Sequence, residues 1–446
     1  MTGRPSPTLL LAVAAVLISA LDGALLVQRQ DDAVASVDGA ADVASPGPSA
    51  SPSPSAAAET LQEQLERIAR LVAELRGLPD ADLPVVRYVS RAELADEVRS
   101  ELDAYSVADA DRDARVLVAL GVLEPGTDLR ALILTAYSEQ VAGFYDPEVA
   151  EIVVPSDDTS HRLGRLDELT LAHEIGHALV DAGMGLVSMD LADDAGEDAA
   201  LAATALQEGD AELVMAQYIQ EGFSLVDQLA LAQEMVGLVE QLDALTALPP
   251  YVQQSLEFPY IEGFAFVQAL HERGGWAAVN AAYADPPTTT YEILYPDAYL
   301  AGFDPVAPPP LGDPGRSWTE ATTIDMGAAD VRLLFGNAGV DGDGPARLAR
   351  ADRAASTWRG GTLRLWTQGE GSAVAWHLAH VGGSAFCTAL RGFYDAAIVG
   401  DQLVEDTDTG ATWDGPRQAA AMACDDTTAR LAMAPDLATA SRMLTP

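Results

Sequence analysis

The stretch LTLAHEIGHALVDAG, residues 169–183, carries two histidines and a glutamate within five positions of a mostly apolar sequence. His173 and His177 are four residues apart, so on a helix both imidazoles lie on one face and can bind a single tetrahedral Zn²⁺. Glu174 is turned toward the same side, where it can take a proton from water at the metal. The uncharged neighbours indicate a buried helix over residues 167–182. This pattern favours a catalytic metal helix over two histidines packed in a core.

A catalytic zinc site needs a third protein ligand and an open position for water. The metzincin pattern continues with a glycine and a further histidine after the second ligand, but this chain has Val180 and Gly183 at those places. The metzincin class is therefore excluded, and the third ligand is expected elsewhere in the chain.

The segment ALQEGDAELVMAQY, residues 205–218, lies in a long helix expected over about residues 198–221. Glu208, with Glu212 one turn later, resembles the gluzincin arrangement, in which a glutamate on the following antiparallel helix is the third ligand. The resemblance implies Glu208 as the ligand, and Glu212 or Asp210 as the acid that holds a zinc histidine by a hydrogen bond. Gluzincins commonly have aspartate where this chain has Glu212, so the choice between the two acids stays open. His271 is the reserve candidate for the third ligand.

The composition describes a large and strongly acidic chain. Its 446 residues allow two or three domains with full cores, so zinc is not needed to hold the fold. The 68 acidic residues outnumber 25 basic ones, all of them arginine, and give a net charge of −43. Such a charge repels phosphates, so we expect no nucleic acid partner and no direct contact with an anionic membrane.

The N-terminal region has the composition of an export segment. Arg4 precedes an apolar run from Thr8 to Leu21, and residues 1–30 are predicted to be a signal peptide or an N-terminal membrane anchor. Residues 31–58, rich in Ser, Pro and Ala, are predicted to be a disordered linker. The body is thus expected outside the cell or at its surface. There, the only two cysteines, Cys387 and Cys424, are expected to form one disulfide.

The remaining patterns predict an α+β protein. Residues 59–303 are expected to form a zincin-like metallopeptidase domain, residues 304–315 a Pro-rich linker, and residues 316–446 a C-terminal α+β subdomain. Within the first domain we predict a strand at 85–89 and a hairpin at 141–155. A helix is expected to begin at the capping box formed by Ser90 and Glu93. Further helices are predicted at 60–77, 109–122, 127–139, 225–246 and 260–283.

The hairpin has a place in the expected site. In zinc peptidases of this helix arrangement an antiparallel edge strand pairs with the substrate backbone, and GFYDPEVAEIVV directly precedes the metal helix. Ordinary sheet packing is the alternative for these residues. The helix at 60–77 is expected to pack on the body rather than to cover the cleft as a pro-region.

Four segments together resemble a bacterial exported family of zinc metallopeptidases: GFYDPEVAEIVV, LAHEIGHAL, ALQEGDAELV and FPYIEGFAFVQALHERGGWAAVNAAYADPPTTTYEILYP. The resemblance covers about half of the chain, from 85 to 300, and extends more weakly to RAASTWRGGTLRLW. Where the family usually has a histidine before the last proline, this chain has Tyr295. If that histidine stabilises an oxyanion, Tyr295 can still donate a hydrogen bond, without the positive charge.

These patterns predict an exported peptidase with one Zn²⁺ per chain, held by His173, His177 and Glu208, and with Glu174 as general base. Its expected partner is a protein or peptide substrate, membrane contact is expected only through the N-terminal segment, and the oligomeric state is open. The alternative is a catalytically silent, peptidase-like surface protein for binding or cell-wall assembly. A hydrolase of non-peptide amides is a weaker alternative. The intact Glu174 argues against a silent protein, because a structural site has no use for a base.

Overall fold

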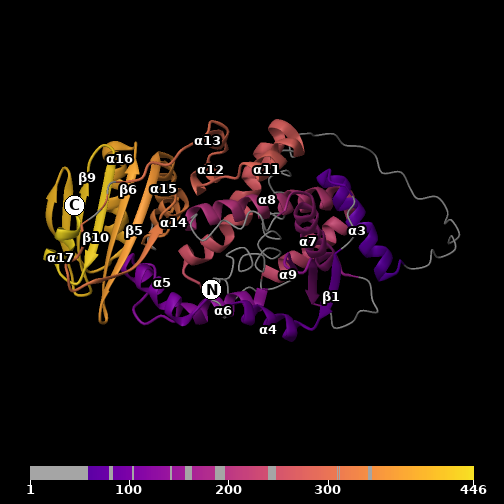
Figure 1. Cartoon of the computed structure of the whole chain (residues 1–446), viewed down its shortest axis with the longest axis horizontal. Helices are drawn as coiled ribbons and strands as arrows, with labels where there is room; N and C mark the ends of the chain where they lie inside the picture. The colour runs from indigo at the N-terminus through magenta and orange to yellow at the C-terminus, as the bar shows by residue number, and fades with distance from the viewer. Residues whose placement is uncertain are drawn as a thin grey trace, which may run out of the picture.

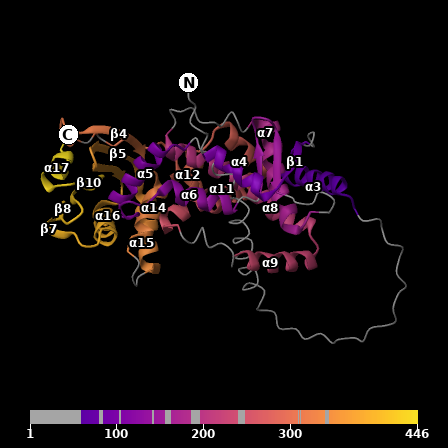
Figure 2. The same ribbon diagram turned by 90° about the horizontal axis from the view of Figure 1, so that it is seen from below.

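The computed structural model describes residues 59–79, 84–102, 105–140, 143–155, 163–185, 196–239, 248–308, 310, 312–339 and 344–445. The predicted export segment at 1–30, the predicted linker at 31–58 and the end of the helix expected at 225–246 lie outside these residues. A mainly helical unit occupies one end of the long axis, and a sheet with its own helices occupies the other (Figure 1). The same arrangement is visible from below (Figure 2).

The first unit contains a small sheet with the strand order β1 (Val85–Val89), β3 (Glu151–Pro155), β2 (Phe144–Asp146). β1 runs parallel to β3, and β2 pairs antiparallel with β3, so the predicted hairpin is present and β2 is an edge strand. Successive residues of β3 face opposite sides. Ile152 and Val154 pack in the core with Leu171 and Ile175, whereas Val153 packs in a separate core cluster on the other face.

The described helices of the first unit largely match the predicted ones. The capping box is present, because Ser90 Oγ accepts from the Glu93 N–H at 3.2 Å and a Glu93 carboxylate oxygen accepts from the Ser90 N–H at 2.8 Å. None of the helices in the described ranges has both the length and the apolarity needed to cross a bilayer. The helices are α3 (Leu61–Arg76), α4 (Arg91–Leu102), α5 (Val107–Ala119), α6 (Leu129–Gln140), α7 (Arg165–Met184), α8 (Glu197–Gly222), α9 (Leu225–Val239), α11 (Pro250–Ala284), α12 (Thr290–Leu294) and α13 (Pro296–Leu300).

The second unit is built on an antiparallel sheet of seven strands in the order β4-β5-β6-β10-β9-β8-β7. Helices α14, α15 and α16 pack in the main core of this sheet, while α17 packs on a separate cluster lined mainly by alanines. The fold class is therefore α+β, as predicted. The elements are β4 (Thr319–Asp325), α14 (Ala328–Asn337), α15 (Gly344–Thr357), β5 (Trp358–Gln368), β6 (Gly371–His380), α16 (Gly383–Ala397), β7 (Gln402–Thr407), β8 (Gly410–Asp414), β9 (Ala419–Cys424), β10 (Thr428–Ala434) and α17 (Leu437–Met443).

The two units share their packing. Val116 and Leu120 from the region of α5, and Tyr291 from α12, belong to the core cluster of the seven-stranded sheet. Thr290 Oγ1 donates to Asp198 on α8 at 2.5 Å and accepts from the Ala329 N–H on α14 at 3.0 Å. Residues 304–315 therefore join the two units in sequence, but side chains from before this linker complete the second core.

Two glycines set the distance between α8 and α11. A Cβ on Gly209 would lie 2.1 Å from the carbonyl oxygen of Gly263, and a Cβ on Gly263 would lie 2.1 Å from the carbonyl oxygen of Ala205. Because real Cβ atoms do not come this close to backbone, the two helices can cross here only through glycine. The close crossing fixes the position of the helix segment that carries Glu208.

Candidate metal centre

Helices α7 and α8 bring together the three residues predicted to hold a metal. The Nε2 atoms of His173 and His177 lie 3.0 Å apart, and a Glu208 carboxylate oxygen lies 3.3 Å from the first and 3.4 Å from the second. Metal bonds of about 2.0–2.2 Å in tetrahedral geometry place ligand atoms about 3.3–3.5 Å apart. The three side chains are almost completely buried. The two distances to Glu208 fall in this range and the two imidazole nitrogens lie slightly closer, so the cluster suits a single metal ion.

The contacts show that α7 and α8 run antiparallel. Glu168 near the start of α7 accepts a hydrogen bond from Tyr218 near the end of α8 at 2.6 Å, while His177 farther along α7 lies beside Glu208. The arrangement is the one expected from the sequence. One further cluster in the described part of the chain, His380 with Cys387 and Cys424, has metal-ligand chemistry.

The electrostatics of the cluster follow from its burial and its charges. Burial alone would raise the pKa of Glu208, but the imidazoles of His177 and His173 outweigh burial and lower that pKa to about 2. Burial alone would lower the pKa of His173, but the neighbouring carboxylates, Glu208 foremost, raise that pKa to about 9. Without metal, the site therefore holds an anionic carboxylate against a cationic imidazole.

Glu174 has the environment expected of a base that waits for a substrate. Its side chain is completely buried, and neither carboxylate oxygen has a hydrogen-bond partner. Burial raises its pKa, and the neighbouring imidazoles of His173 and His177 act in the opposite direction. An unpartnered buried carboxylate costs free energy, so it calls for a partner that binds there. The backbone N–H of Tyr145 on β2 is close enough to lower the pKa of this carboxyl, which places the strand beside Glu174.

The structure separates the two acids that the sequence left open. A Glu212 carboxylate oxygen approaches His173 Nδ1 to 3.4 Å, an ion-pair distance rather than an aligned hydrogen bond. Asp210 instead accepts two hydrogen bonds from the Arg76 guanidinium, at 2.7 and 2.8 Å. Glu212 is thus the acid next to His173, and Asp210 fastens α8 to α3.

Arg76 is a structural partner of the site that the sequence did not reveal. It is completely buried at the end of α3, where it also donates to Asn280 at 2.7 Å and stacks over the ring of Trp276. Its Nη1 has no hydrogen-bond partner. No local pattern marks Arg76, because its partners are far away in the sequence. The buried contacts agree with α3 as a packing helix rather than a removable pro-region.

Tyr295 and His271 lie in other surroundings. The Tyr295 hydroxyl donates to the backbone carbonyl of Asp352 on α15 at 3.3 Å, so in this structure it is engaged with the second unit. The ring of His271 packs against Trp276 at 4.8 Å between centroids, and His271 is not part of a metal-ligand cluster among the described residues. The oxyanion role of Tyr295 stays a prediction, and Glu208 rather than His271 completes the cluster.

Comparisons of the chain with family models, with curated proteins and with solved structures found no match.

Proposed function

We propose that this protein is an exported zinc-dependent peptidase. The observation that carries the proposal is the convergence of His173, His177 and Glu208 at 3.0–3.4 Å, next to the unpartnered carboxylate of Glu174. A purely structural metal site would use a fourth side chain and would not require a buried, unsatisfied acid beside it. This combination of three ligands and a free base is the one that metal-assisted hydrolysis requires.

Zinc bound by these ligands would act as a Lewis acid, lowering the pKa of a coordinated water toward about 7 and polarising the scissile carbonyl. Glu174 accepts the proton of the attacking water and returns it to the leaving amine. Burial raises the pKa of the Glu174 carboxyl, and a raised pKa makes this carboxylate a better proton acceptor near neutral pH. Glu212 orients His173 through Nδ1, so that Nε2 faces the metal position.

Edge strand β2 supplies a binding element for an extended peptide. Among the described residues β2 pairs only with β3, and the Tyr145 hydroxyl donates to Asp181 on α7 at 2.8 Å. This contact holds the strand against the metal helix. An added strand of substrate on the free edge would run past Glu174, as in β-augmentation.

One observation favours the silent, peptidase-like binding protein as a second candidate. The Tyr295 hydroxyl, expected to stabilise the oxyanion, is engaged by the carbonyl of Asp352. A site without this donor would bind metal and an extended segment but hydrolyse it slowly.

The deciding experiment measures zinc content and cleavage of casein and a peptide library by the full chain. Glu174→Gln should retain stoichiometric zinc and lose cleavage, whereas Glu208→Ala should lose zinc. His271→Ala, outside the cluster, is the matched control and should change neither. Stoichiometric zinc without hydrolysis of any substrate would favour the binding protein, and absence of zinc would refute both candidates.

A further inference from the structure

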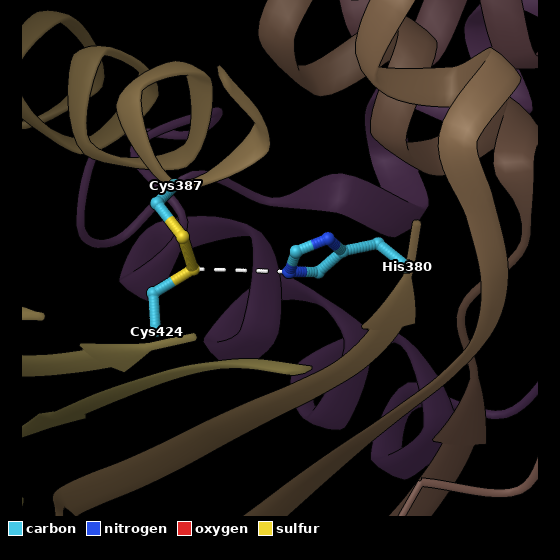
Figure 3. A group of neighbouring side chains, drawn as sticks. All are labelled: His380, Cys387 and Cys424. Atoms are coloured by element: carbon cyan, nitrogen blue, oxygen red, sulfur yellow. Dashed lines mark hydrogen bonds between the residues drawn. A yellow bond between two sulfur atoms is a disulfide. The ribbon is translucent and has the colours of Figure 1, made fainter. Parts of the chain in front are cut away.

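The second unit contains a chemically distinct cluster around the disulfide between Cys387 and Cys424. Cys387 lies on α16, Cys424 ends β9, and His380 ends β6 (Figure 3). Figure 3 shows the imidazole pointing at the disulfide, with Nε2 3.8 Å from the Cys424 sulfur. The predicted disulfide is therefore confirmed, and a buried histidine lies in contact with one of its sulfur atoms.

The hydrogen bonds of His380 decide what its ring can do. The Gly382 backbone N–H donates to Nδ1 at 3.2 Å. Nδ1 therefore carries no proton and accepts with its lone pair, so the proton of the neutral ring is on Nε2. A metal at Nε2 would require the opposite tautomer and the loss of this hydrogen bond. Phe386 stacks on the imidazole at 4.2 Å and fixes its orientation. The ring can thus donate Nε2–H to the Cys424 sulfur, and the Thr428 backbone also hydrogen-bonds this ring, so the tautomer suits donation rather than metal ligation.

The two cysteine residues differ in exposure. Cys424 is 6% exposed, whereas Cys387 is only half-buried on α16. The Cys387 sulfur also lies 3.4 Å from the carbonyl oxygen of Asp425, which can accept a thiol hydrogen once the bond is open. An attacking thiolate must approach in line with the S–S bond, and the more exposed residue, Cys387, is the expected point of attack, with Cys424 as the leaving group.

We propose that the Cys387–Cys424 disulfide is a thiol–disulfide exchange site, at which an external thiol forms a mixed disulfide with Cys387 and the Cys424 thiolate is stabilised by His380 Nε2–H. The co-reactant is a small thiol or dithiol. Asp425 and Asp426 add negative charge near His380, which disfavours an anionic thiol relative to an uncharged one.

The exchange balances in two steps. The external thiolate forms a new S–S bond with Cys387 Sγ, and the electron pair of the broken bond leaves on Cys424 Sγ. A second thiolate then attacks the external sulfur of the mixed disulfide and releases Cys387 as a thiolate. The dithiol is oxidised by two electrons, the protein disulfide is reduced by two, and the protons lost by the two external thiols are taken up by the cysteines. A hydrogen bond to the leaving thiolate speeds the first step, because thiols of lower pKa leave faster.

The first test uses the native full chain and needs no variant. The protein is treated with an uncharged dithiol in buffer, and with glutathione as the anionic arm, while the intrinsic fluorescence is recorded and mixed disulfides are located by mass spectrometry. We expect reduction without unfolding, an adduct on Cys387, and slower reaction with glutathione at equal thiolate concentration. Reduction only in step with unfolding, or an adduct on Cys424, would overturn the proposal.

The second test isolates the histidine. His380→Phe keeps a ring for stacking but removes Nε2–H, and His271→Ala is the matched distant control. In a Cys387→Ser background, the Cys424 thiol should titrate below the usual 8.5 or so of a free cysteine, and His380→Phe should raise that value by about one unit. In the intact protein, reduction by the dithiol should slow at least about threefold. Unchanged titration and rate would refute a role for His380.

The alternative to thiol–disulfide exchange is that His380, Cys387 and Cys424 bind a metal ion when the disulfide is reduced. The reduced protein, carrying His173→Ala and His177→Ala so that the first cluster is disabled, is titrated with Co²⁺. Thiolate charge-transfer absorption at one Co²⁺ per chain would show that Cys387, Cys424 and His380 bind metal, and would overturn the exchange assignment. The whole test is independent of the proposed peptidase activity.

Discussion

The glycine of the EGDA segment offers a quantitative test of the helix crossing behind the metal centre. Gly209→Ala adds a single methyl group, which would lie 2.1 Å from the carbonyl oxygen and 2.2 Å from the carbonyl carbon of Gly263. Both atoms belong to backbone, so no side-chain rotation can relieve the contact. Gly176 in the HEIGH segment is the matched control, because its added Cβ would meet its nearest neighbour, Ala211, at 3.7 Å.

The two substitutions should change stability in opposite directions. Overpacking of a tight contact typically costs about 1–3 kcal/mol, and alanine in a helix interior gains up to about 1 kcal/mol over glycine. For Gly209→Ala the clash outweighs the gain, so we expect the free energy of unfolding to fall by about 2 kcal/mol. For Gly176→Ala the contact is ordinary, and we expect a rise of about 0.5–1 kcal/mol. The variants should thus differ by about 3 kcal/mol.

The assay is urea unfolding of the metal-free protein, followed by a zinc titration of the folded variants. Removing the metal first keeps its binding energy out of the comparison. Because Gly209 follows Glu208 directly, movement of α8 should also weaken zinc binding in Gly209→Ala but not in Gly176→Ala. Equal stability of the two variants, or greater damage from Gly176→Ala, would refute the account of the crossing.

Glu212→Gln should weaken zinc binding about 10–100-fold, measured by competition with a chelator, because the carboxylate lies 3.4 Å from a ligand imidazole. Asp210→Asn should instead lower stability by about 3–5 kcal/mol, measured by urea unfolding, because it leaves a buried guanidinium without its counter-charge. Burial raises the pKa of Asp198 to about 7 from an ordinary 3.8, so its contribution is fully present below pH 4 and is lost as pH rises through 7. Thermal unfolding at pH 5 and pH 8 should therefore show a smaller difference for Asp198→Asn than for the unchanged protein.

The sequence predicts those parts of the candidate site whose residues are neighbours on one helix. His173, Glu174 and His177 lie within one turn, so helical periodicity alone predicts a shared face. The same periodicity could have decided between the two acids of α8. Glu212 is one turn from Glu208 and shares its face, whereas Asp210 is rotated by about 200° and must point away.

Long-range contacts and weakly patterned strands could not be predicted. The hydrogen-bond partners of Arg76, Asp210 and Asn280, lie 134 and 204 positions farther along the chain, so no local pattern reveals its role. Strand β7 is exposed along its whole length and lacks the apolar alternation that marks a half-buried strand. The resemblance to a family motif predicts a role for Tyr295 but says nothing of the second unit, whose backbone accepts its hydrogen bond.

The buried end of α3 also bears on the order in which the chain folds during synthesis. The Arg76 guanidinium remains in water until Asp210 and Asn280 have emerged, because these residues are its partners. Trp276, whose indole N–H donates to the Leu75 carbonyl at 2.6 Å, arrives at the same late point. The first helix in the described part of the chain is therefore among the last to be fixed in place. A nascent chain shorter than about 280 residues cannot complete the core on which α7 and α8 rest.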